Sequence, residues 1–153
     1  GTPGKEFVVM KSLLHLWQTW AILSAISAAA TAILAKVGVG AISSDLATLI
    51  RTAVVLALAT AVVSISGGFS QIAAVPGRAW LFLVLSGLAT GASWLCYFRA
   101  LKLGAASRVA PVDKLSVVVI AIFAALFLGE RLSPQATVGV ALIAAGAGLV
   151  AWQ

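Results

Sequence analysis

Three charged residues stand inside long apolar stretches of the sequence, where binding an ion or a charged ligand is the chemistry open to them. Arg51 lies about five residues into one stretch and Asp113 with Lys114 about five residues into another, roughly 8–10 Å deep at about 1.5 Å per helical residue. A charge inside a bilayer costs about 2.5–3.5 kcal/mol even on a lenient scale. These side chains therefore predict either a binding cavity or an ion pair between two helices.

We favour the cavity, because two positive charges and one negative charge leave about one unpaired positive charge at this depth. Arg51 and Lys114 are expected to hold a carboxylate or a phosphate, with Asp113 as the counter-ion. Trp94 and Tyr97, which lie toward the end of the apolar stretch between them, are expected to line the same cavity. The alternative is a purely structural ion pair between the stretches that carry Arg51 and Asp113.

Two further features of this region leave alternatives open. Asp113 is the residue through which coupling to protons would run, although no pattern identifies the coupling ion. Pro111 is interpreted as a proline tolerated in the first turns of a helix. The other interpretation is a local break that frees carbonyl groups toward a cavity, as in the discontinuous helices of transporters.

The composition indicates that the solvent of this chain is a lipid bilayer. Of the 153 residues, 62% are hydrophobic and 9% are charged, whereas a soluble domain carries about 25% charged residues. This excludes a soluble globular enzyme, and it excludes disorder because disordered chains are polar. One cysteine and one histidine leave no disulfide, no metal-ligand cluster and no Ser-His-Asp set. We therefore expect no enzyme activity, no cofactor and no metal.

The chain contains five stretches that are long and apolar enough to cross a bilayer as helices, which takes about 20 residues. This predicts an all-α integral membrane protein with one domain, at 10–153. Residues 1–9 are interpreted as the remnant of an expression tag, with a natural start at Met10. The predicted spans are 16–37, 46–66, 79–101, 109–128 and 135–152.

The charges between the spans do not favour one orientation in the membrane. On the side that holds Met10 the connections carry three positive residues, and on the other side they also carry three, including Lys36 and Lys102. Either the loops are misassigned and hide a bias, or copies insert both ways and pair antiparallel. Because the ten Lys and Arg residues are spread thinly between apolar runs, they indicate helix flanks and no nucleic-acid partner.

The last span carries a spacing of small residues that suits close helix packing. Gly139 and Gly146 are seven residues apart and therefore lie near one face of the helix. Helices in lipid have no hydrophobic drive to associate, so small residues matter because they let two backbones approach. The combination predicts a helix-to-helix contact in the last span.

Several longer segments carry a resemblance to a known family. These are the stretch from Trp80 to Gly104, the continuation to Ser116, the step Leu128-Gly-Glu-Arg131 and the run from Gly139 to Gly146. Together they resemble the EamA domain of the drug/metabolite transporter superfamily, and most closely its small five-helix bacterial and archaeal members. The resemblance covers roughly Trp17 to Trp152.

The resemblance implies that the chain is a single EamA-type repeat. Larger members fuse two repeats of opposite orientation, so a five-helix chain would be completed to ten helices as an antiparallel homodimer. The cavity would lie between protomers, lined by the first four helices. The last helix is similar to the dimerising helix of small multidrug-resistance proteins, which implies a dimer contact through Gly139, Leu142, Ile143 and Gly146. Those exporters carry a glutamate in their first helix, and this chain has none there, so proton-coupled export of drug cations is not expected.

These observations predict a multi-pass transporter of the inner (plasma) membrane that moves a small anionic or zwitterionic metabolite by alternating access. Its partners would be the substrate, membrane lipids and a second copy of the chain. Two rivals stay open. One is a flippase for an anionic lipid carrier, whose phosphate would occupy the basic cavity. The other is a membrane subunit that transports nothing and pairs with another protein.

Overall fold

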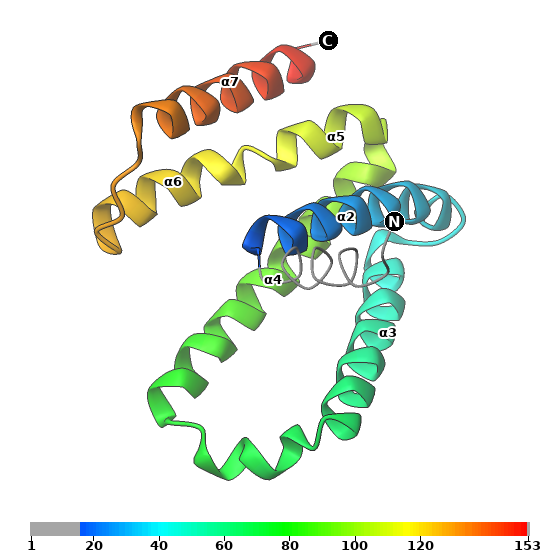
Figure 1. Ribbon diagram of the computed structural model, residues 1–153. Helices are drawn as coiled ribbons and strands as arrows, with labels where there is room; N and C mark the ends of the chain where they lie inside the picture. Colours follow the sequence, from blue (N-terminus) through cyan, green and yellow to red (C-terminus); the bar gives the residue numbers. More distant parts are fainter. Residues whose placement is uncertain (1–15, 153) are drawn as a thin grey trace, which may run out of the picture.

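The computed structural model of the chain describes residues 16–152. The predicted tag remnant at 1–9 and the predicted start at Met10 lie outside the described residues. Every regular element within 16–152 is helical (Figure 1). In chain order the elements are α2 (Trp17–Val39), α3 (Ser44–Ile65), the 3₁₀-helix η1 (Gly68–Ala74), α4 (Gly77–Leu103), α5 (Ala106–Asp113), α6 (Ser116–Phe127) and α7 (Pro134–Ala151).

The helices form five segments that are long and apolar enough to cross a membrane, with α5 and α6 together making the fourth. The predicted spans agree with these segments to within three residues at each end. The agreement follows from the bilayer itself, because a backbone in lipid must satisfy its polar groups internally and an apolar run of this length does so as a helix. The prediction of five transmembrane helices is confirmed at this level.

Local chemistry sets several of the helix ends. The Ser43 hydroxyl accepts a hydrogen bond from the Leu46 amide at the start of α3, and the Ser133 hydroxyl accepts one from the Ala136 amide at the start of α7. Gly67, after α3, has φ 70°, and Gly129, after α6, has φ 67°. Both are in the left-handed region that glycine enters without steric cost, so each allows the chain to turn out of its helix.

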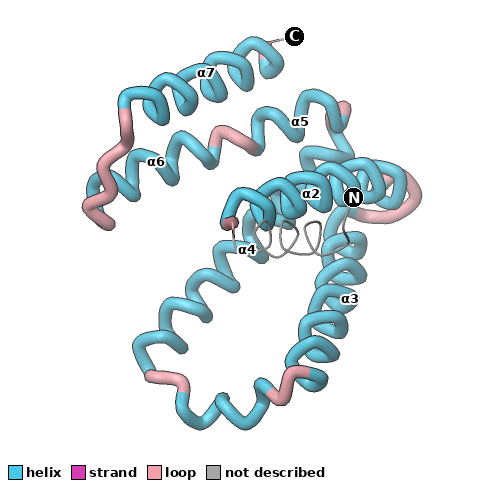
Figure 2. The backbone as a smooth tube through the Cα atoms, in the orientation of Figure 1, coloured by secondary structure: helices cyan, strands magenta, loops and turns pink. Residues whose placement is uncertain are grey.

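The helices form two groups, one of α2, α3 and α4 and the other of α5, α6 and α7. The helices of the first group meet at one end of the molecule. Figure 1 shows α3 and α4 close together at that end and diverging toward η1, which connects them, with α2 crossing near their junction. The tube drawing in Figure 2 shows α7 running antiparallel beside α6 and α5, on which it packs. A small core fills the junction, where Val39 of α2, Ala47 of α3, and Phe98 and Leu101 of α4 are buried together.

Two lysines tie the helices together at this junction. The Lys36 ammonium, on α2, donates hydrogen bonds to the carbonyl oxygens of Leu101 at 2.6 Å and Gly104 at 2.7 Å, at the end of α4. The Lys102 ammonium donates to the carbonyl oxygen of Ile42 at 2.6 Å, in the loop between α2 and α3. The last carbonyls of a helix have no partner within it, so Lys36 satisfies that of Leu101 at the end of α4, while Lys102 joins this end of α4 to the loop after α2. Each lysine also lies in the last turn of its own helix, at the negative end of the helix dipole.

The fourth span is interrupted shortly after Pro111, so both features named by the two interpretations are present: a proline inside the first turns of a helix, and a break close to it. Pro111 lies in the second turn of α5, where its missing N–H leaves the Ser107 carbonyl without a helical donor. The helix ends at Asp113. The amides of Lys114 and Leu115 then bond to carbonyls three residues back instead of four, at 3.1 Å and 3.0 Å. The chain resumes as α6 at Ser116.

Candidate binding cavity

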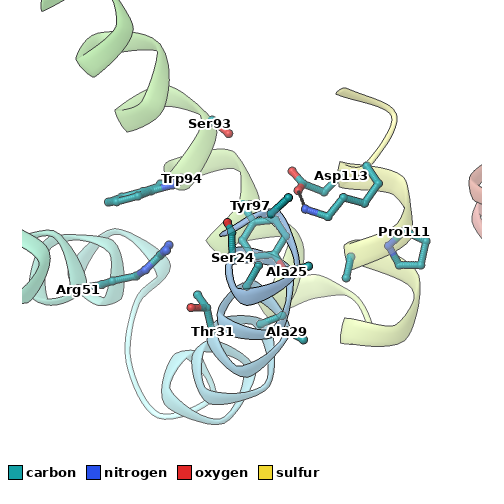
Figure 3. Close-up of a pocket in the computed structure, with 15 residues that line it drawn as sticks. Ser24, Ala25, Ala29, Thr31, Arg51, Ser93, Trp94, Tyr97, Pro111 and Asp113 are labelled. Carbon is teal, nitrogen blue, oxygen red and sulfur yellow. Dashed lines mark ion pairs between the residues drawn. The ribbon is translucent and has the colours of Figure 1, made fainter. Parts of the chain in front are cut away.

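A hollow lies between α2, α3, α4 and the break after α5. Its volume is about 660 Å³, which is within the range of about 300–1,000 Å³ typical of small-molecule sites. Figure 3 shows its lining side chains. They are Ala21, Ser24, Ala25, Ala28, Ala29, Thr31 and Ala32 of α2, Arg51 of α3, Ser93, Trp94 and Tyr97 of α4, Ala110, Pro111 and Asp113 of α5, and Lys114.

The contribution of α2 to the cavity is a face of small side chains. Its alanines recur at intervals of three and four residues from Ala21 to Ala32, which places them on one side of a helix with 3.6 residues per turn. Because alanine projects only a methyl group, this face leaves space in front of α2 that larger side chains would fill. We did not predict this face from the sequence, although the alanine spacing is visible in it.

Arg51 lies over aromatic rings of α4. Its guanidinium carbon is 4.1 Å from the centroid of the Trp94 ring and 5.5 Å from that of the Phe98 ring. Trp94 and Phe98 are four residues apart and therefore share one face of α4. A cation over an aromatic face gains about 0.5–2 kcal/mol. These rings hold the Arg51 charge at the cavity wall without neutralising it.

Asp113 pairs with its neighbour in the chain and not with Arg51. The Lys114 ammonium nitrogen is 3.6 Å from Oδ2 of Asp113, and the two side chains are 57% and 40% exposed. No ion pair within residues 16–152 involves Arg51 or joins α3 to α5. The alternative of a structural ion pair between these helices is therefore wrong for the described residues. The expected role of Asp113 as counter-ion applies to Lys114 alone.

The five residues predicted for the cavity all line it: Arg51, Trp94, Tyr97, Asp113 and Lys114. In the view of Figure 3, Arg51 and Trp94 lie on one side, Asp113 lies on the other, and Tyr97 lies between them. The cavity thus has a cationic end with aromatic walls and a dipolar end that carries an ammonium and a carboxylate. A carboxylate, a phosphate or a zwitterion finds complementary charge at these two ends.

The residues predicted for a dimer contact lie on the outer side of α7. Leu142 is 68% exposed and Ile143 is 43% exposed, whereas Ala147 is buried. A Cβ atom added at Gly139 or at Gly146 would meet no atom within 4 Å. These four positions are thus free of close packing within the protomer.

Comparison with known proteins gives the class of this chain. Residues 15–152 match the model of the EamA-like transporter family, so the chain belongs to that family. It is a multi-pass membrane transporter, as the five apolar helices and the family together indicate.

A similar protein is also described as a transporter. A Sinorhizobium sp protein described as an uncharacterized transporter in the cobO 3′ region is 63% identical to this chain over 135 residues, which are 88% of this chain and 96% of the relative. No solved structure matches the chain. The family membership confirms the resemblance drawn from the sequence, and it points to transport rather than to catalysis.

Proposed function

We propose that the protein is a secondary-active transporter that carries a small anionic or zwitterionic metabolite across the inner (plasma) membrane. The observation that supports this proposal is Arg51, a cation at the wall of the cavity that has no acidic partner among residues 16–152. A guanidinium presents paired N–H donors that match the geometry of a carboxylate or a phosphate. An anionic group entering the cavity would supply the partner that Arg51 lacks.

The dipolar end of the cavity supports a zwitterionic substrate as well as a simple anion. The distance of 3.6 Å between Lys114 and Asp113 is longer than an N–H···O hydrogen bond, and both side chains are partly exposed. Such a pair is weak, so a substrate can separate its members at little cost. A substrate ammonium group would then bind Asp113, while a carboxylate would bind Arg51 or Lys114.

We further propose that the working unit is an antiparallel homodimer that operates by alternating access. The exposed side of α7 supplies the contact between copies. The break between α5 and α6, directly beside Asp113, is a point at which two half-helices can reorient, as in other transporters with interrupted helices. In a symmetric inverted pair the inward-open and outward-open states are equal in energy, so the substrate gradient or a coupling ion sets the direction.

The test is counterflow in proteoliposomes. Vesicles are loaded with an unlabelled carboxylate, phosphate ester or amino acid, and uptake of the same labelled solute is measured. Saturable uptake is expected for at least one of these classes. Arg51→Gln should weaken it by about 10- to 100-fold, because a hydrogen bond to a charged group contributes about 1.5–3 kcal/mol.

Arg99→Gln is the matched control, since Arg99 is exposed on the same helix as Trp94 and does not line the cavity. It should leave uptake unchanged. If the folded protein exchanged none of these solutes, or if the two glutamine variants lost uptake equally, the proposal would be wrong. A stable partner protein that co-purifies with a transport-inactive chain would instead support the membrane-subunit alternative.

A further inference from the structure

A second hollow adjoins the cavity, between α2 and α3. Its volume is about 330 Å³, and it is open along one side. Its wall is apolar, with Leu34, Val39, Ile42, Ala47, Ile50 and Phe98 among the residues that form it. We call it the α2–α3 groove. Thr31 and Arg51 line both the groove and the cavity, so the two hollows meet at these residues.

Among residues 16–152, Arg51 is the only charged residue that lines the groove. Its guanidinium is held at the border by Trp94, from the cavity side, and by Phe98, which also forms the groove wall. A ligand whose anionic group binds Arg51 therefore has two directions for the rest of its structure. One leads into the cavity toward Lys114 and Asp113, and the other leads along the groove, whose wall is apolar apart from Thr31 and Arg51. A hydrocarbon chain in the groove is stabilised by leaving water.

We propose that the transported anion is amphipathic and carries a single aliphatic chain of medium length, which lies in the α2–α3 groove while its head group binds Arg51. This inference rests on the proposed function and names its substrate class. The groove follows α2 from Thr31 to Gly38, which is roughly 10 Å at about 1.5 Å per residue. An acyl chain of a membrane lipid spans one leaflet, about half of the 30 Å hydrocarbon core. The groove therefore fits one shorter chain and not the paired chains of a phospholipid.

The groove can be filled without disturbing Arg51. Gly38 lines it, is exposed, and would place an added Cβ atom more than 4 Å from every neighbouring atom. The change Gly38→Leu therefore introduces a side chain into the groove without a backbone clash. Gly87→Leu is the matched control, because Gly87 lies in α4, lines neither hollow and also has open space around its Cβ position.

The experiment measures binding of labelled butanoate and octanoate to the protein in nanodiscs, with empty nanodiscs as the blank. Each methylene removed from water strengthens binding by up to about fourfold. We expect octanoate to bind at least about tenfold more tightly than butanoate, since the groove is open on one side. Gly38→Leu should abolish this preference and leave butanoate binding unchanged, whereas Gly87→Leu should keep it. Arg51→Gln should weaken both anions by a similar factor.

The results separate this inference from the proposed function. If butanoate and octanoate bound equally well to the unchanged protein, the chain site would be wrong while anion transport stood. If octylammonium bound as tightly as octanoate, selection by Arg51 would be wrong. If the purified protein retained a two-chain lipid that Gly38→Leu released, the groove would be a phospholipid site and the inference would be overturned. Absence of binding for every anion, together with absent counterflow, would reject both proposals.

Discussion

The charged residues of the cavity differ in whether a residue of opposite charge lies close to them. Arg51 lies over the Trp94 and Phe98 rings and forms no ion pair within the described part of the chain, whereas Lys114 and Asp113 form a loose pair beside the helix break. An aromatic face stabilises a cation without supplying a negative charge, so the electrostatic attraction of Arg51 for an anion is kept. The anion-binding capacity of the cavity thus depends first on Arg51 and on the ring that positions it.

Replacing Trp94 tests whether its ring positions Arg51 for anion binding. We expect Trp94→Ala to weaken binding of a transported anion by about 2- to 30-fold, the equivalent of about 0.5–2 kcal/mol for a cation–π contact. Trp94→Phe, which keeps an aromatic face, should recover most of the affinity. The measurement is competition by the anion in the counterflow assay. Trp80→Ala serves as the control, because Trp80 lies at the start of α4 and outside the cavity, and an equal effect there would contradict the role of Trp94.

Among the helices, α2, α3 and α4 are joined at one end of the bundle by buried side chains and by hydrogen bonds. The buried side chains of α2, α3 and α4 meet there, and Lys36 and Lys102 bind main-chain carbonyls across the junction. Two of the positive charges that were counted for membrane orientation therefore have structural contacts. Away from this junction α3 and α4 diverge, and the fourth span is interrupted (Figure 1). The buried contacts between α2, α3 and α4 thus lie at this junction.

Removing the lysine contacts should lower the stability of the junction in a defined order. Lys36→Met deletes two hydrogen bonds from a half-buried ammonium group, and Lys102→Met deletes one from an exposed group. A hydrogen bond to a charged group contributes about 1.5–3 kcal/mol, and less where water screens it. Lys36→Met should therefore reduce the unfolding temperature in detergent clearly more than Lys102→Met. The reverse order would show that these contacts do not hold α2 to α4.

The molecule as a whole turns its large apolar side chains outward. Leu56 of α3 is 66% exposed, Phe127 of α6 is 74% exposed and Leu149 of α7 is 72% exposed. Burial of such surface in a soluble protein would be needed for folding, but in a bilayer the lipid chains provide an equally apolar environment. The outward face of α7, with Leu142 at its centre and glycines beside it, is also where we propose that a second copy binds.

Cysteine cross-linking distinguishes an antiparallel pair from a parallel one. Val138, Leu142 and Leu149 are 60%, 68% and 72% exposed on the outer side of α7. In an antiparallel pair, Leu142→Cys lies near the crossing point and should form a disulfide with its own copy. Val138→Cys should then cross-link with Leu149→Cys in mixed dimers and not with itself, because a disulfide needs Cα atoms within about 7 Å.

The cross-linking is measured in membranes, in a Cys96→Ser background because Cys96 is free and exposed. A parallel pair would give self-linked products at both Val138→Cys and Leu149→Cys. That outcome would contradict inverted pairing and with it the proposed alternation of two oppositely inserted copies.

The residues of the sequence were sufficient to locate the spans and to select the cavity-lining charges. Helix positions follow from the length of each apolar run, because lipid permits no other way to satisfy the backbone. Arg51, Asp113 and Lys114 stand out for a similar reason, since a charge in such a run is too costly to keep without a contact. Both conclusions depend only on neighbours along the chain.

The pairing of these charges, the break after Asp113 and the α2–α3 groove required the tertiary structure. Which carboxylate meets which cation depends on distances between helices, and the sequence contains no such distance. The alanines of α2 became a cavity wall only because α3, α4 and α5 stand opposite them. Arg51 lies over Trp94 and Phe98, while Asp113 pairs with Lys114. The energetic cost of placing a charge in an apolar stretch depends on its neighbours along the chain, so the sequence reveals it. Which group that charge pairs with depends on how the helices pack, so only the tertiary structure reveals it.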